Sequence, residues 1–107
     1  MIIIMITMNT QLGKWKEVMQ TLLSISESTV KEKGCISCQA YHGIDDNNIF
    51  SMIEEWETRK DLDRYMNSNR FKVLLGLKSL LSEPQEVRIY TVTHYEGMEA
   101  VNAARII

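Results

Sequence analysis

The opening segment Ile2–Met8 is apolar at every position except Thr7, and most of its side chains are β-branched. A strand with one solvated face alternates apolar and polar side chains, whereas a continuous apolar run is typical of a strand covered on both faces. The run is too short to span a membrane, and it lacks the basic leader of a signal peptide. The chain must therefore build a sheet around this strand and cover both of its faces.

Periodicity and turn residues divide the rest of the chain into further elements. We expect a helix over 14–33, a strand over 35–44, a turn at 45–48, a returning strand over 49–57, a helix capped by Thr58 and interrupted at 67–69, and a strand over 86–94. The order βαββαβ is that of the α+β ferredoxin-like fold, with a four-stranded antiparallel sheet and both helices on one face. We assign residues 1–94 to this domain and 95–107 to a tail that forms a short helix.

Two helices on one face would leave the other face of the sheet bare. Exposed apolar patches of this kind mark interfaces, and a chain of 107 residues gains stability from burying more surface. Packing two sheets face to face across a twofold axis satisfies both conditions. We therefore expect a homodimer.

Composition narrows the classes of partner. The formal net charge is -2, and Lys and Arg are scattered among Asp and Glu, so the chain offers no concentrated positive field for nucleic acid. No segment reaches membrane-spanning length, which predicts a cytoplasmic protein without a membrane partner.

Cys35 and Cys38 form a Cys-Ile-Ser-Cys spacing, but on a strand residues three apart point to opposite faces. We expect two plain thiols rather than a redox or zinc pair.

Several segments resemble the antibiotic biosynthesis monooxygenase superfamily over roughly Ile3 to Thr93. They are Lys33–Ser37, Phe50–Glu57, Leu62, Asn67–Phe71 and Leu81–Pro84, and the most specific is Ile53-Glu54-Glu55-Trp56 just before a capped helix. The resemblance implies a dimeric α+β barrel with a pocket between the sheet and its helices. It also implies oxidation of quinols or polycyclic phenols by O₂ without flavin, haem or metal.

Two positions depart from the family pattern. Members often carry a histidine on the second helix, where this chain has Tyr65, and another just before Phe71, where it has Arg70. The haem-degrading branch has asparagine, tryptophan and histidine at positions that here hold Ile6, Tyr65 and Leu75 or Leu77. Haem degradation is therefore disfavoured.

The strand over 49–57 supplies the first candidate site residues. Glu54 and Trp56 share one face with Phe50 and Met52 because they lie two apart on a strand. If this face meets the helices, desolvation raises the pKa of Glu54 towards that of a useful base. The alternative is a structural glutamate. Trp56, Phe50 and Met52 are candidate substrate contacts, although a buried tryptophan is also a common packing anchor.

Three further side chains complete the candidate set. Tyr65 takes the place of a family histidine and is a candidate hydrogen-bonding group for a substrate oxygen. His42 is a candidate base because imidazole titrates near neutral pH, with a satisfied interior or interface histidine as the alternative. Arg70 is a candidate ligand for an oxyanion.

We therefore expect a cofactor-independent monooxygenase that oxidises a small quinol-like or phenolic aromatic with O₂. The sequence has no phosphate-binding glycine loop, nucleophile elbow or metal-ligand cluster. A non-catalytic binding or sensing protein of the same fold is the alternative, and an isomerase on the same scaffold is a third possibility.

Overall fold

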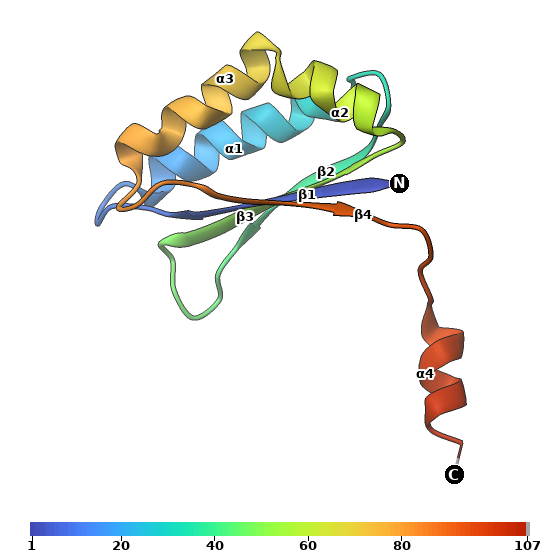
Figure 1. Cartoon of the computed structure of the whole chain (residues 1–107). Coiled ribbons are helices and arrows are strands. Elements are labelled where there is room, and N and C mark those ends of the chain that lie inside the picture. Colours follow the sequence, from blue (N-terminus) through green and yellow to red (C-terminus); the bar gives the residue numbers. More distant parts are fainter. Residues whose placement is uncertain (107) are drawn as a thin grey trace.

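A computed structural model describes residues 1–106 of the chain. Its elements are β1 (Ile2–Asn9), α1 (Trp15–Thr29), β2 (Cys35–His42), β3 (Ile49–Trp56), α2 (Arg59–Met66), α3 (Asn69–Gly76), the 3₁₀ turn η1 (Leu77–Leu80), β4 (Glu86–Thr91) and α4 (Met98–Ala104). Figure 1 shows α1, α2 and α3 as one layer over a single face of the sheet. None of the described helices is long and apolar enough to cross a membrane.

The four strands form one antiparallel sheet in the order β2-β3-β1-β4. Ile4, in the middle of β1, lies opposite Glu54 on one side and Ile89 on the other. This order places β1 and β3 in the centre and leaves β2 and β4 as edges. The predicted ferredoxin-like α+β fold is confirmed.

The two faces of β1 differ in what covers them. Ile2, Ile4, Ile6 and Met8 are buried beneath the helices, where they meet the apolar face of α1. The alternate residues, such as Ile3 and Met5, are only half-buried on the open face. The structure thus places one side of the apolar run in the core and leaves the other side for a further contact.

The helix starts follow capping rules. The Thr58 hydroxyl accepts a hydrogen bond from the Asp61 N–H, so Thr58 caps α2 as predicted. The Ser68 hydroxyl accepts from the Phe71 N–H and caps α3, which explains the predicted interruption as the junction of two helices.

The connection from α1 to β2 depends on Gly34. The helix α1 ends at Thr29, four residues before the predicted end, and a tight turn follows. Gly34 has a φ of +84°, and a Cβ at this position would lie 2.2 Å from the Asp61 Cγ. Only glycine fits this position, because it needs a left-handed backbone and the adjacent space is filled by Asp61.

A β-bulge at the start of β2 corrects one prediction. The register shifts between Cys35 and Ser37, so Cys35 lies opposite Trp56 and Cys38 opposite Glu54. Both cysteines therefore face the helices, whereas simple alternation predicted opposite faces. Ile36, the extra residue of the bulge, is 49% exposed, and Ile44 lies beyond the end of the strand and is 98% exposed.

Candidate active site

Glu54 is a carboxylic acid with no solvent exposure at the centre of the helix-facing side of the sheet. The Trp56 Nε1–H donates a hydrogen bond to Glu54 Oε1 at 3.0 Å, while Oε2 receives no hydrogen bond from any described residue. Burial raises the pKa of Glu54 to about 7, and the bond from Trp56 offsets part of this effect. The carboxyl therefore exchanges its proton near neutral pH.

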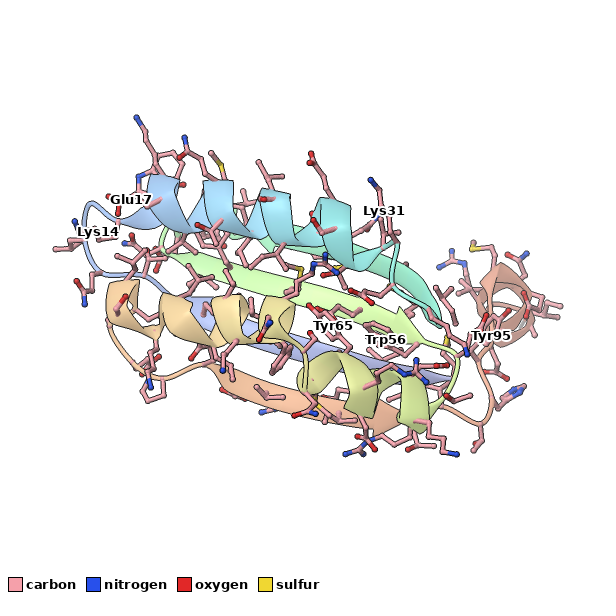
Figure 2. All side chains as sticks on the ribbon, turned by 90° about the horizontal axis from the view of Figure 1, so that it is seen from above. Lys14, Glu17, Lys31, Trp56, Tyr65 and Tyr95 are labelled. Carbon is pink, nitrogen blue, oxygen red and sulfur yellow. The ribbon has the colours of Figure 1, made fainter. Side chains whose placement is uncertain are left out.

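Three packed aromatic rings and a buried pair of hydroxyl groups lie near this carboxyl. Tyr65 stacks on Trp56 with ring centroids 4.8 Å apart and forms a T-shaped pair with Phe71. The Tyr65 and Thr29 hydroxyls are hydrogen-bonded at 3.0 Å, so α1 and α2 are joined above the sheet. Burial raises the pKa of Tyr65, followed by the charge of Glu54, so the phenol stays protonated. Figure 2 shows Tyr65 and Trp56 side by side beneath the helix layer.

Two thiols lie against the same carboxyl. The Cys38 Sγ lies 3.5 Å from the Met52 Sδ, and both cysteines are free thiols. Burial and then the nearby Glu54 raise the pKa of Cys38, and the same two causes raise that of Cys35 to about 11. Thiols with raised pKa values are poor nucleophiles, so they serve here as small apolar neighbours of the carboxyl.

Arg70 lies outside this buried cluster, at the start of α3, and forms an ion pair with Glu32. A surface groove of about 320 Å³ runs between α1 and α3 and is lined by Ser24, Ile25, Ser28, Asn69, Arg70 and Val73. Ser28 adjoins Thr29, and the positive charge of Arg70 acts on the Tyr65 hydroxyl. The groove is therefore near the Tyr65–Thr29 hydroxyl pair, although neither of these two residues lines it.

The structure separates His42 from the other candidates. His42 is exposed and lies opposite Phe50, whereas Glu54 lies opposite Cys38, four residues away along β2. This spacing is about 13 Å at the rise of a β-strand. His42 stacks between Trp15 and Phe50, and its Nε2–H donates to the Asn47 carbonyl at 2.6 Å. His42 and Phe50 thus form a separate aromatic stack at one end of the sheet.

Sequence reasoning identified Glu54, Trp56, Met52 and Tyr65, which the structure brings together, but it missed Thr29. The buried positions of α1 are Val18, Leu22, Ile25 and Thr29, at helical spacing. A threonine that continues an apolar helix face is the signal that could have revealed this residue. Among residues 1–106, no three His, Cys, Asp or Glu side chains are grouped closely enough to hold a metal ion.

The model of one protein family, Antibiotic biosynthesis monooxygenase, matches residues 1–75. The chain belongs to this family. An uncharacterized protein of Synechocystis is 30% identical over 80 residues, covering 74% of this chain and 52% of the relative. The chain thus spans about half the length of that relative.

Solved structures share the family's fold. A Deinococcus radiodurans protein of the antibiotic biosynthesis monooxygenase type superposes with a TM-score of 0.83 at 17% identity, covering 91% of this chain and 97% of the other. A conserved protein from Methanosarcina mazei has a TM-score of 0.78 at 31% identity, covering 83% and 89%. At 17% identity the first likeness shows the fold alone.

Within this family fold, the arrangement around Glu54 combines three chemical properties. It combines a carboxyl whose pKa lies near 7, a phenol that remains protonated, and packed apolar core residues that include Trp56 and Met52. Such a site can accept a proton from an acidic hydroxyl and can donate to an oxygen atom that gains negative charge.

Proposed function

We propose that the chain is a cofactor-independent monooxygenase that oxidises a quinol-like or phenolic aromatic with O₂. The observation that carries the proposal is the fully buried Glu54, whose Oε2 has no protein partner and whose pKa lies near 7. Membership of the monooxygenase family supports the same class of reaction.

In this proposal Glu54 accepts the hydroxyl proton of the substrate. The resulting phenolate is electron-rich and reduces O₂ directly, so the substrate supplies all the electrons. For a phenol with a free ring position, a C–H group becomes a carbonyl, one oxygen atom enters the product, and the other leaves as water. The Tyr65 hydroxyl donates a hydrogen bond to the oxygen that gains charge, and the Trp56 ring supports the aromatic substrate.

In this proposal the groove between α1 and α3 is the entry side for the substrate, because Arg70 in the groove lies near Tyr65. Arg70 in this groove then stabilises the oxyanion that forms when Glu54 takes the proton, beside the Tyr65–Thr29 hydroxyl pair. The Glu32 carboxylate, which now pairs with Arg70, gives way to the bound oxyanion. His42 lies at the other end of the sheet, so we assign it no catalytic step.

Oxygen uptake by the purified, metal-free protein tests this function. A panel of naphthols and naphthoquinols should be consumed faster than they autoxidise, and Glu54→Gln should lower kcat/KM by about 100-fold or more. Tyr65→Phe should lower kcat with a smaller effect on KM. Glu55→Gln, on the open face of the sheet, is the matched control and should retain the wild-type rate.

The pH profile adds an independent readout. Because Glu54 must be ionised to act as a base, kcat/KM should rise with pH through about 7 and then level off. An uptake rate equal to autoxidation for the whole panel would exclude the monooxygenase.

We further propose that two copies associate through their open sheet faces. Ile3, Met5 and Ile53 are half-buried there, and the rings of Tyr41 and Tyr90 are 48% and 42% exposed. An apolar centre with aromatic side chains around it and polar residues among them is typical of a protein–protein interface. Sedimentation analysis should give twice the mass of the chain.

Ligand binding without turnover is the second candidate function. Two observations favour it: Trp56 and Tyr65 fill the space around Glu54, and both family histidines are replaced. A small aromatic molecule found bound by native mass spectrometry, together with no oxygen uptake, would support this function over catalysis.

A further inference from the structure

The C-terminal arm, residues 93–106, leaves the body of the protein. Backbone hydrogen bonds between Met1 and Val92 mark the end of the sheet, and the arm's own backbone hydrogen bonds are local. No residue of α4 is buried. Figure 1 shows α4 clear of the body, on the opposite side of the sheet from α1, α2 and α3.

An isolated helix of this size needs a surface to pack against. The helix α4 has 7 residues, whereas helices shorter than about 12 residues are marginal in water without tertiary contacts. Met98 and Val101 lie one turn apart and are 66% and 46% exposed, and Ile106 beyond them is 81% exposed. The arm therefore carries an apolar side that packs against none of residues 1–92.

The arm could have folded back on its own sheet. It leaves the body beside a hollow of about 460 Å³ on the open face, lined by Met1, Ile3, Ile36, Glu55, Val92 and Tyr95. Instead of turning into this hollow, α4 extends away from the open face (Figure 1). This direction leads to the space that a second sheet would occupy.

We propose that α4 of each chain packs its apolar side against a second copy of this chain. The inference rests on the paired assembly proposed above and adds a reciprocal exchange of arms. The five residues between Val92 and α4 can span up to about 17 Å. Packed sheets lie about 10 Å apart, so the linker is long enough to carry α4 past the facing sheet.

The area of the open face also calls for an additional contact. Four strands of up to 8 residues cover about 500 Å² on each copy, given standard strand spacing and rise. Stable protein interfaces bury about 800 Å² per partner. Two exchanged arms, each burying its own apolar side and an equal area of the other copy, enlarge the contact beyond this flat footprint.

Isotope mixing with photo-cross-linking tests the exchange in the full-length chain. Light and ¹⁵N-labelled protein carrying Val101→p-benzoylphenylalanine is mixed, unfolded, refolded and irradiated. Exchange between copies predicts that about half of the cross-linked peptide pairs join a light to a heavy chain. Cross-links only within one chain would overturn the proposal, even if the protein is a dimer.

A second variant measures the strength of the contact. The double substitution M98S and V101S lies outside the proposed active site and should weaken dimerisation by about 100-fold or more. An unchanged dissociation constant would overturn the proposal, and so would a wild-type chain that sediments as a monomer. Oxygen uptake by the same samples is measured in parallel. It tests the proposed monooxygenase activity, whereas the cross-links and the dissociation constant test the exchange of α4.

Discussion

The substitution Glu54→Gln should reverse its effect on stability as the pH rises. The pKa of Glu54 is about 7 in the folded protein, against an ordinary value of 4.5. Between these values the unfolded chain has lost the proton while the folded chain keeps it, so unfolding releases a proton and the free energy of unfolding falls as pH rises. The difference of about 2.5 pKa units corresponds to a loss of about 3 kcal/mol.

Glutamine lacks this titration and still accepts the hydrogen bond from Trp56. At about pH 4.5 we expect the variant to be less stable than the wild type by about 1 kcal/mol, because its amide N–H groups enter a buried site with no acceptor. At about pH 8 the variant should be more stable by about 2 kcal/mol. The order of stability therefore reverses between these two conditions.

Urea denaturation followed by circular dichroism, at several pH values and one protein concentration, measures the effect. The concentration must be fixed because association contributes to apparent stability. Glu55→Gln, which removes a carboxyl from the open face of the same strand, keeps Glu54 and should retain the fall in stability. If the stability difference between Glu54→Gln and wild type is the same at every pH, the buried carboxyl does not titrate as argued.

The remaining predictions concern the supports of the site. Gly34→Ala should destabilise the fold by about 3 kcal/mol, because the added Cβ overlaps Asp61 and the backbone conformation is strained for alanine. Gly13 has a similar φ of +79° but open space around it, so Gly13→Ala should cost only about 1 kcal/mol. Urea denaturation midpoints of the two variants measure the two losses of stability. Equal losses would refute the contribution of the overlap with Asp61. Tyr65→Phe should cost about 1 kcal/mol by leaving the buried Thr29 hydroxyl without this partner, and thermal unfolding against Tyr95→Phe, an exposed control, measures it.

Much of the fold follows from local patterns in the sequence. The apolar run of β1, the Asp45–Asn48 turn and the Thr58 cap each have a local physical cause, so the order of elements was predictable. The bulge at Cys35 was not, because Ile36, Cys38 and Ala40 read as regular alternation. Only the register with β3 reveals the extra residue.

The candidate site was predictable in part for the same reason. Parity along β3 correctly grouped Glu54 and Trp56 on one face, and the structure shows that this face meets the helices. Parity carries no information on distance along a strand, so it could not show that His42 lies far from Glu54. Thr29 was missed because its role depends on Tyr65, a residue 36 positions away.

The bulge at Ile36 inserts one extra residue between two parts of the chain whose positions are set by different contacts. Before the bulge, the turn at Gly34 packs closely against Asp61. After the bulge, Cys38 pairs with Glu54, and this pairing sets which side chains of β2 face the helices. A chain shortened by this one residue could satisfy one of these constraints only by breaking the other. This single extra residue therefore links the position of Gly34, beside the cap of α2, to the surroundings of the buried carboxyl, although its own side chain lies on the open face of the sheet.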